Sequence, residues 1–368
     1  MRKVVICGIL LDSDAYPNSA NTIQILKNNG HVIHDKSIKL EKHLWSSVSG
    51  SKISSLIAVL RLLTSSIFTV IRVLPYLRKK QIAVFITYPS IFPLLLLSPI
   101  KPFIRAQLIC DFYISVWDSA FNDRSIGNKL SSFLIKKLEQ LSLLTTDKLI
   151  VDTLKNKQFY KQSLGIAEHK ILPLPLAIDE SFNPCPFDRK PKKITRVLFI
   201  GTFVPLQGTD TIQQAISLLQ NHPIHFTIIG SGQSSHNNEI STENVTRITE
   251  WMPLHAAEKL IEKSDICLGV FGGTPKSGRV LPYKVYLYLK HGKPVITQNA
   301  FSLPVNAVLP VTTIPPKSGE ALAKAILTLS KNARPYSAHE VKAFYQKNLS
   351  NHQVKQAWEA LLSTNESR

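Results

Sequence analysis

Short apolar runs alternate with segments of helical period through the second half of the chain, and this alternation restricts the possible folds more than any other feature. The runs of strand length are Arg196–Ile200, His225–Ile229, Val245–Ile248, Ile266–Val270 and Pro294–Thr297. The segments of helical period between them are Asp210–Gln220, Ala256–Lys263 and Tyr283–Lys290. Repeated strand–helix units predict a parallel sheet with helices on both faces, so we expect a doubly wound α/β domain here.

The first half shows a similar pattern with less regularity. Its predicted strands are Lys3–Leu10, His31–Asp35, Ala83–Thr87, Gln107–Cys110 and Lys148–Asp152, and its predicted helices are Asn21–Asn29, Ile53–Leu77 and Phe133–Leu144. Between the halves, Asn183–Lys193 is rich in proline and lysine, which marks a domain boundary. We predict one domain over 1–182, a linker over 183–195 and a second domain over 196–340. A helical tail over 341–368 could pack back on the first domain.

The charge balance indicates an anionic partner. The 368 residues include 44 Lys and Arg against 25 Asp and Glu, a formal net charge of +19. Nucleic acid, a membrane surface and phosphorylated substrates all fit such an excess. The sequence has no RNP-like, zinc-finger or helix-turn-helix pattern, so we predict no nucleic-acid partner. Four separated cysteines, Cys7, Cys110, Cys185 and Cys267, fit buried thiols in a reducing compartment rather than metal ligands.

The segment Ile53–Leu77 is long enough to cross a membrane. However, Arg61 and Arg72 lie about three helical turns apart, on the side of Ser54 and Ser65, which predicts an amphipathic helix with a narrow polar stripe. Arg78-Lys79-Lys80 and the apolar segment SIFPLLLLSPIKPFIR follow it. These features predict that the first domain docks on an anionic leaflet, with the protein peripheral on the cytoplasmic, inner face of the membrane.

A first candidate for phosphate binding is the segment VLFIGTFVPLQGTDTIQQA. Its strand ends at Gly201, its loop ends at Gly208, and a helix begins near Thr209. In a doubly wound sheet, ligands bind at the carboxyl ends of the strands, where helix N-termini attract anions. Two interpretations remain open: a diphosphate-binding loop, or an ordinary turn with Thr209 as helix N-cap.

A second candidate is the segment FGGTPKSGRVLPYKVYLYLKHGKPVIT. After Phe271 and Gly272, its loop brings Lys276, Arg279 and Lys284 towards the start of a helix that follows Pro282. Converging cations suit a nucleotide diphosphate, because the leaving group gains negative charge in the transition state. The alternative is a basic loop exposed to solvent, but proline at the helix start and the glycines favour a binding site.

Four segments in this order resemble the C-terminal half of glycosyltransferase family 4: VLFIGTFVPLQGTDTIQQA, FTIIGSGQ, ITEWMPLHAAEKLIEKSDICL and YLKHGKPVIT. The resemblance extends from Val197 to Thr297, and the first half matches more loosely through DFYISVWDSAFNDR, LLTTDKLIVDTLKNKQFY and LPLPLAIDESFNP. It implies a GT-B fold, with two Rossmann-like domains that face a cleft. It also implies a UDP- or GDP-sugar donor bound by the second domain, retention of anomeric configuration, and no required metal or other cofactor.

The chain departs from the family pattern at several positions. Thr202 and Gln207 stand where family members commonly have Arg and Lys, and the family's Glu-x7-Glu motif falls on Arg279 and Leu287. The Pro-x-Lys pattern that ends at Lys284 resembles a divergent branch in which a lysine contacts the phosphates. The predicted donor-binding residues are Gly201, Thr202, Gln207, Gly208, Gly230, Gly232, Trp251, Met252, Phe271, Gly272, Lys276, Arg279 and Lys284, with Trp251 and Met252 beside the base.

The predicted catalytic residues are Asp111 and Asp118, in the segment DFYISVWDSAFNDRS. Either carboxylate could orient an acceptor hydroxyl or stabilise an oxocarbenium-like state, although an acid here is equally consistent with a structural role. Asp123-Arg124 could form an internal ion pair. Asp12-Ser13-Asp14 has the form of a DxD motif but follows the first strand, whereas a GT-A metal site is expected in mid-chain, so we predict no metal site.

Together these patterns predict a transferase. It would move a sugar from a nucleotide-sugar to a glycan or lipid-linked acceptor, in cell-surface polysaccharide or lipopolysaccharide biosynthesis. One alternative is a non-catalytic GT-B subunit that partners an active transferase, which would explain the missing family glutamates. A nucleotide-sugar epimerase is a second alternative, but its acid and base residues are not identifiable in the sequence.

Overall fold

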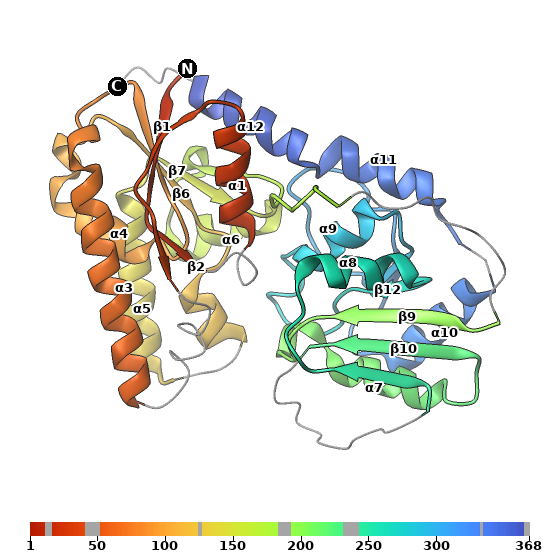
Figure 1. Cartoon of the computed structure of the whole chain (residues 1–368). Coiled ribbons are helices and arrows are strands. Elements are labelled where there is room, and N and C mark those ends of the chain that lie inside the picture. The colour runs from red at the N-terminus through yellow and green to blue at the C-terminus, as the bar shows by residue number, and fades with distance from the viewer. Residues whose placement is uncertain are drawn as a thin grey trace. The chain divides into compact units, whose positions relative to one another are not determined.

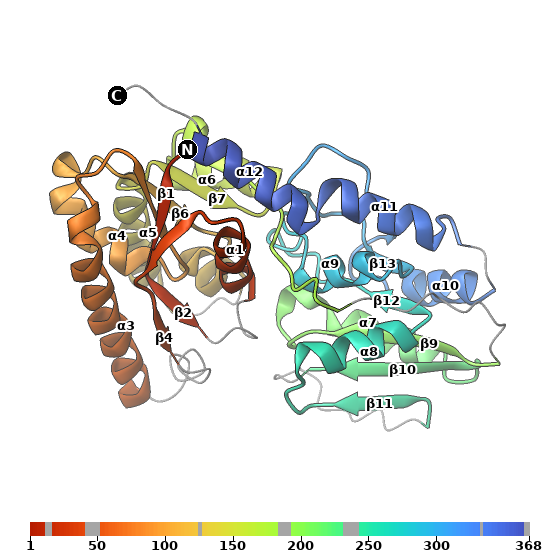
Figure 2. The ribbon, with the colours of Figure 1, turned by 45° about the horizontal axis from the view of Figure 1, so that its top comes forward.

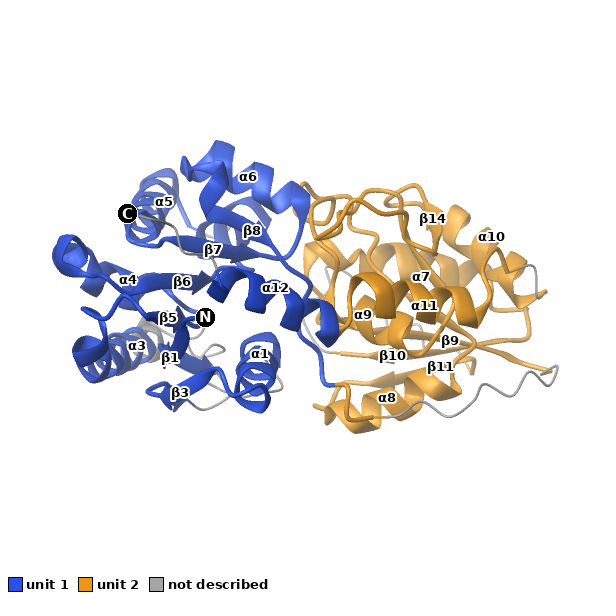
Figure 3. Cartoon of the chain, turned by 90° about the horizontal axis from the view of Figure 1, so that it is seen from above, with its two compact units in different colours: residues 1–179, 351–368 blue, residues 180–350 orange. Residues whose placement is uncertain are grey.

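The computed structural model describes residues 1–11, 17–40, 52–123, 127–182, 193–230, 243–331 and 334–363. The chain divides into two compact units, 1–179 with 351–368 and 180–350 (Figure 3). Most of the predicted linker, 183–192, lies outside the described residues. The predicted tail 341–368 is divided between the units: α11 (Ala338–Asn348) lies in the second unit and α12 (Asn351–Ser363) in the first.

The first unit is built on a parallel sheet with the strand order β3-β1-β5-β6-β7-β8 (Figure 1). Its strands are β1 (Lys3–Cys7), β3 (Val32–Asp35), β5 (Ile82–Ile86), β6 (Gln107–Asp111), β7 (Lys148–Val151) and β8 (Ile171–Pro173), and a separate parallel pair is formed by β2 (Ile9–Leu11) and β4 (Ile38–Leu40). Its other α-helices are α1 (Pro17–Asn28), α3 (Lys52–Val73), α4 (Ile91–Leu97), α5 (Lys129–Leu144) and α6 (Leu154–Leu164). Its shorter helical turns are η1 (Leu74–Tyr76), η2 (Ser98–Phe103), η3 (Asp118–Asp123) and η4 (Glu168–Lys170).

Alternate residues of the first sheet build two apolar layers. Val5 and Cys7 of β1 pack in the core beneath α3, α4 and α5, whereas Val4 and Ile6 pack in the core beneath α1 and α12. Trp358 of α12 is buried edge-on against Phe85, with 4.8 Å between the ring centroids. The C-terminal helix is therefore part of the first unit's core. Figure 3 shows α1 and α12 on the face of the sheet opposite α3 and α4.

The second unit is a parallel sheet with the strand order β11-β10-β9-β12-β13-β14 (Figure 2). Its strands are β9 (Thr195–Ile200), β10 (Ile224–Ile229), β11 (Val245–Ile248), β12 (Ile266–Leu268), β13 (Val295–Gln298) and β14 (Thr312–Ile314). Its other helices are η5 (Pro205–Gln207), α7 (Thr209–Leu218), α8 (Leu254–Lys263), α9 (Tyr283–Lys290) and α10 (Gly319–Ser330). In chain order this is the 3-2-1-4-5-6 arrangement, whose strand order reverses between its first and fourth strands, here β9 and β12. The prediction of two doubly wound parallel sheets is confirmed.

The predicted polar stripe of α3 is wrong in part. Arg61 and Arg72 are exposed, but Ser65 is buried, and the surface beside the arginines is apolar. Buried Thr69 explains the inward polar side: its hydroxyl accepts a hydrogen bond from the Gly8 amide at 2.9 Å and donates to the Lys36 carbonyl at 2.8 Å. Small polar side chains thus let the helix bond to the loops beside β1. The side chain of Ser54 lies outside the described residues.

The span Leu56–Tyr76 is 21 residues long with a mean hydropathy of 1.9, so by length and composition it could cross a membrane. Its inward side chains, including Val70 and Val73, belong to the core of the first unit. Lifting the helix out of the unit would expose that side of the sheet to water, at a large cost in buried apolar area. We therefore interpret α3 as a core helix whose outer side is apolar.

Candidate functional site

Two loops cross at the carboxyl end of the second sheet, where the strand order reverses. The loop after β9 leads through η5 to α7, and the loop after β12 meets it from the neighbouring strand. The Phe271 amide donates to the Gln207 carbonyl at 3.0 Å, and the Gly272 amide donates to the Leu206 carbonyl at 3.2 Å. In doubly wound sheets this position is the usual ligand crevice.

Glycines allow this crossing because the backbones are too close for a side chain. A Cβ atom on Gly272 would lie 2.1 Å from the Pro205 carbonyl oxygen, and one on Gly208 would lie 2.4 Å from the Phe271 carbonyl carbon. Gly230, at the end of β10, is equally confined, because its Cβ would lie 2.0 Å from the Gly201 carbonyl oxygen. Packing between loops therefore requires these glycines, and a contact between them and a ligand stays a prediction.

Lys284 lies beneath the loop after β9. Its ammonium donates to the side-chain oxygen of Gln207 at 2.7 Å and lies 3.8 Å from the centroid of the Phe199 ring. The side chain is only 7% exposed, and burial lowers the pKa of its ammonium well below the usual value. The fold thus brings together the two predicted residues Gln207 and Lys284, which are 77 positions apart in the chain.

A cavity of about 570 Å³ opens beside the crossing loops. Its lining residues are Phe203, Val204, Pro205, Gly208, Thr209, Asp210, Thr211, Gln214, Gly272, Thr274 and Lys317. Gly208 and Gly272 were predicted from the sequence, but Lys317 was not. This lysine has a φ of 59°, and its amide donates to the Phe271 carbonyl at 2.9 Å. In the sequence, Lys317 is marked only by its position before Ser318, the N-cap of α10. The fold is needed to place Lys317 beside the crossed loops.

Gln298 anchors the loop that carries Lys276 and Arg279. The Gln298 side chain accepts a hydrogen bond from the Gly273 amide at 3.0 Å and donates to the buried Ser277 hydroxyl at 3.0 Å. Lys276 and Arg279 are both partly buried on this loop. The loop therefore presents its two cations from a fixed backbone at the same edge of the sheet.

The remaining predicted donor residues lie further from the crossing or have no described contact there. Thr202 is exposed beside Gly201, and Trp251 (56% exposed) and Met252 follow β11, at the sheet edge beyond β10. Gly232 lies outside the described residues. Leu287 is buried in α9, so an aliphatic side chain occupies the position where the resemblance implies a ribose-binding glutamate.

Asp111, at the end of β6, is an internal carboxyl group in the first unit. It is 1% exposed, and its Oδ2 atom accepts a hydrogen bond from the Ser19 hydroxyl of α1 at 2.5 Å. Burial raises the pKa of Asp111 to about 7, and the Ser19 hydrogen bond opposes this rise. The raised pKa favours the neutral form of this side chain, which stabilises a cationic sugar less than a carboxylate would.

Asp118 lies in the turn of η3 and is also buried. Its carboxylate accepts a hydrogen bond from the side-chain amide of Asn122 at 3.0 Å. The preceding loop is held by Glu139 of α5, which accepts from the Ser115 hydroxyl at 2.7 Å and from the Val116 amide at 2.6 Å. Burial raises the pKa of Glu139 to about 7. Glu139 was not predicted as a site residue, although it is the only acid in its helix.

Several remaining predictions from the first half concern residues outside the described ranges. Asp12-Ser13-Asp14 lies outside the described residues, and so does Arg124, the predicted partner of Asp123. Within the described ranges, no group of three or more His, Cys, Asp or Glu side chains could hold a metal ion. Cys7, Cys110 and Cys267 are buried free thiols, and Cys185 lies outside the described residues.

Comparison with known proteins identifies the fold of the chain. Residues 194–332 match the family model described as glycosyl transferases group 1, which confirms the resemblance found in this half. No curated protein matches the sequence. One similar solved structure is the trehalose-6-phosphate protein from E. coli bound with UDP-2-fluoro glucose, with 13% identity, 100% of both chains covered and a TM-score of 0.68.

Two other solved structures share this fold. The Anabaena protein HepE in complex with UDP has 10% identity, with 98% of this chain and 99% of that chain covered and a TM-score of 0.62. A Listeria monocytogenes protein provisionally described as a UDP-N-acetylglucosamine 2-epimerase has 12% identity, with 100% and 98% covered and a TM-score of 0.56. These likenesses show the GT-B fold, as predicted, and at such low identity they show the fold alone.

Proposed function

We propose that this chain is a glycosyltransferase that moves a sugar from a UDP- or GDP-sugar to a glycan or lipid-linked acceptor. The observation that carries the proposal is the pair of crossed loops between β9 and β12, with the Lys284 ammonium held beneath them. This half of the chain is also the part that matches the group 1 glycosyl transferases. Neighbours with the same fold were solved with UDP and with UDP-2-fluoro glucose, which supports a nucleotide-sugar donor.

The cations near the crossed loops suit the leaving group of this reaction. In glycosyl transfer, the bond from the sugar C1 to the diphosphate oxygen breaks, and the diphosphate keeps the electron pair. A new bond forms from C1 to the acceptor oxygen, and the acceptor hydroxyl loses its proton. Lys284, together with Lys276 and Arg279, would stabilise the charge that grows on the diphosphate. Because the protein supplies fixed cations, we propose that no metal or other cofactor is required.

We further propose that the reaction retains the anomeric configuration and serves cell-surface polysaccharide or lipopolysaccharide synthesis on the inner face of the membrane. The net charge of +19 supports an anionic membrane surface as a partner. The buried positions of Asp111 and Asp118 favour a positioning role for both carboxyl groups on the acceptor side. Asp111 would act through Ser19 at the start of α1.

A thermal-shift screen against UDP, GDP, UDP-sugars and GDP-sugars tests the donor site. A ligand that binds only the native state raises its melting temperature with ligand concentration. We expect one nucleotide class to shift the wild type, Lys284→Met to lose that shift, and the exposed control Lys259→Met in α8 to keep it. No shift of the wild type with any of these ligands would overturn the donor-site proposal.

The second candidate is a non-catalytic GT-B subunit, and two positions favour it. Gln207 and buried Leu287 replace a lysine and a glutamate that the resemblance leads us to expect. Both candidates predict nucleotide binding, so turnover separates them. The assay uses the donor that gives the thermal shift, together with membrane-derived acceptor lipids. Release of the nucleoside diphosphate, UDP or GDP, would identify a transferase. If the donor binds but no UDP or GDP is released with any of these acceptor lipids, the chain is the non-catalytic subunit.

A further inference from the structure

Three neighbouring helices of the first unit present a large apolar surface to solvent. Helices α3 and α5 both pack against α4, and together they cover one face of the sheet (Figures 1 and 3). The exposed large apolar side chains of this layer are Leu56, Ile57, Leu60, Ile67, Phe68, Ile71, Leu74, Leu96, Phe103, Leu130, Phe133, Leu134, Leu138, Leu141 and Leu144. We call these residues the outer apolar face. Soluble monomers rarely expose so many large apolar side chains in one layer, and such surfaces mark interaction sites.

The two longer helices of this layer expose large apolar side chains while they bury several polar ones. In α5, Leu134 is 51% exposed, whereas Glu139 and Ser142 are fully buried. In α3, Phe68 is 59% exposed, whereas Thr69 is fully buried. An amphipathic helix normally places its apolar stripe inward and its polar side in water. The outward apolar side chains therefore favour contact with an apolar phase other than this protein's core.

The charges around the outer apolar face are almost all positive. No Asp or Glu occurs between Glu41 and Asp111, a segment that contains α3, α4 and both flanking turns. The exposed cations of this layer and its flanking turns are Arg61, Arg72, Arg78, Lys79, Lys80, Arg105, Lys129 and Lys137. The only acid of α5 is the buried Glu139. Two copies of this face would bring like charges together, whereas an anionic lipid surface would complement both its apolar and its cationic groups.

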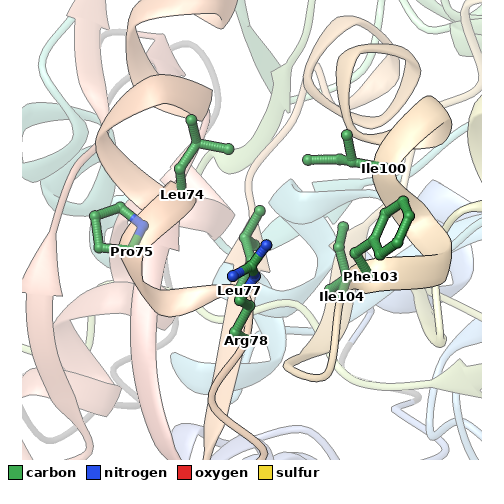
Figure 4. Close-up of a pocket in the computed structure, with 7 residues that line it drawn as sticks. All are labelled: Leu74, Pro75, Leu77, Arg78, Ile100, Phe103 and Ile104. Carbon is green, nitrogen blue, oxygen red and sulfur yellow. The ribbon is translucent and has the colours of Figure 1, made fainter.

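A hollow at one end of the face has the composition of a site for an anionic amphiphile. The cavity of about 460 Å³ is lined by Leu74, Pro75, Leu77, Arg78, Ile100, Phe103 and Ile104 (Figure 4). Figure 4 shows Leu74 and Pro75 on one side, Ile100 and Phe103 on the other, and Arg78 between them. Within the described residues, the Arg78 guanidinium has no ion pair or hydrogen bond. An apolar wall with one guanidinium suits a hydrocarbon chain that carries a phosphate.

We propose that the outer apolar face inserts into one leaflet of an anionic bilayer, with α3 and α5 lying in the plane of the interface. The Arg78 hollow then holds one anionic lipid of that leaflet, with its chain against Ile100 and its phosphate at the guanidinium. The inward side of α3 stays in the protein core, so the helix contacts the membrane without crossing it. This inference rests on the membrane part of the proposed function and does not depend on donor binding.

Flotation of the full-length protein with vesicles tests the proposal. Vesicles contain phosphatidylcholine alone or phosphatidylcholine mixed with phosphatidylglycerol. We expect the wild type to float with the mixed vesicles. The double variant Phe68→Glu/Phe133→Glu should bind the same vesicles at least about tenfold more weakly. The matched control Leu218→Glu changes an equally exposed apolar residue, on α7 of the second unit, and should float like the wild type.

Two further arms locate the contact and the lipid. A tryptophan introduced by Phe133→Trp should be quenched by lipids brominated in their acyl chains. Ile100→Trp fills the hollow, and Arg78→Gln removes its charge, so both should lower the preference for phosphatidylglycerol several-fold. Inorganic phosphate should not compete. Equal weakening by Leu130→Trp, which adds the same bulk on α5 outside the hollow, would overturn the lipid site.

The results that would overturn the insertion itself are equally specific. Wild type that fails to float with anionic vesicles, or a double variant that floats as well as the wild type, would contradict it. A dimer in light scattering that Phe68→Glu/Phe133→Glu dissociates would show that a second copy covers the face. The nucleotide thermal shift of each variant reports on its folding. If the wild type shows no nucleotide thermal shift, that result would count against the donor site, whereas the flotation result would still test membrane insertion.

Discussion

The ammonium of Lys284 lies 2.7 Å from the side-chain oxygen of Gln207, and this contact joins the first turn of α9 to the loop after β9. The resemblance leads us to expect a lysine at position 207 itself. In this chain the cation comes from α9 and reaches the same point from below, across the Phe199 ring. A positive charge is thus placed beside the crossed loops by a different residue.

Replacing Lys284 by methionine should stabilise the protein while abolishing the nucleotide shift. Burial lowers the pKa of this ammonium in the folded state. At a pH between the folded-state pKa and the usual lysine pKa, the lysine is protonated in the unfolded chain but not in the folded protein. Stability therefore rises with pH across that window, and at neutral pH the lysine costs stability. We expect Lys284→Met to raise the free energy of unfolding by about 1–2 kcal/mol, measured by urea denaturation at pH 7.

The gain should shrink as the pH approaches the usual lysine pKa, because the unfolded chain then also loses the proton. Lys259→Met, on the exposed side of α8, should change neither stability nor nucleotide binding. A Lys284→Met protein that is less stable than the wild type at pH 7 would show that the Gln207 and Phe199 contacts outweigh the burial cost.

The crossing of the two loops predicts a sharp difference between two glycines of one segment. A Cβ on Gly272 would lie 2.1 Å from a backbone oxygen, whereas the nearest atom to a Cβ on Gly278 would be 3.6 Å away. We expect Gly272→Ala to lower the free energy of unfolding by about 2–4 kcal/mol and to weaken the nucleotide shift, because the loops must separate. Gly278→Ala should stay within about 0.5 kcal/mol of the wild type. Equal effects would show that the loops do not cross as described.

The sequence predicts the doubly wound sheets because βα periodicity is local information. The same periodicity predicts α5 as a helix, but it does not show that Leu134 and Leu138 face solvent. Which side of a helix is buried depends on its partners, and buried Glu139 is satisfied only by the distant loop that contains Ser115. A rule that places apolar residues inside therefore selects the wrong side of this helix.

The position of the crossed loops was predictable where their residues follow strands, as Gly201 and Gly272 do. The position of Lys317 was not predictable, because its place beside the cavity depends on the order of the strands rather than on a sequence motif near it. The sequence also could not reveal that Asp111 and Asp118 are buried, because a short polar loop after a strand usually lies on the surface.

Asp111 should make stability fall as the pH rises from about 4 to 7. Burial raises its pKa from 3.8 to about 7, so the folded state holds a proton that the unfolded chain has already released. The stabilising contribution is complete below the unfolded pKa and is lost as the pH passes the folded pKa. Asp111→Asn mimics the protonated side chain at every pH. We expect it to match the wild type near pH 3.5 and to exceed it at pH 8 by about 1–3 kcal/mol in urea denaturation.

The same stability difference at both pH values would contradict this interpretation of Asp111. Ser19→Ala is the companion variant, because it removes the hydroxyl that donates to Asp111. It should raise the pKa of Asp111 further and steepen the fall in stability towards pH 8, since this hydrogen bond favours the charged form.

Glu258 fixes the other end of the helix that carries Lys284. Its buried carboxylate accepts from the Lys290 ammonium at 2.8 Å and lies 3.3 Å from Nε2 of His291, which ties α8 to the last turn of α9. Glu258→Leu would leave the Lys290 ammonium buried without this carboxylate, so we expect a loss of about 3–5 kcal/mol in urea denaturation. The double variant Glu258→Leu/Lys290→Met removes both charges and should recover more than half of that loss. If the single and double variants are equally unstable, the carboxylate acts through His291 or through packing, and the Lys290 pair is not what holds α9 in place.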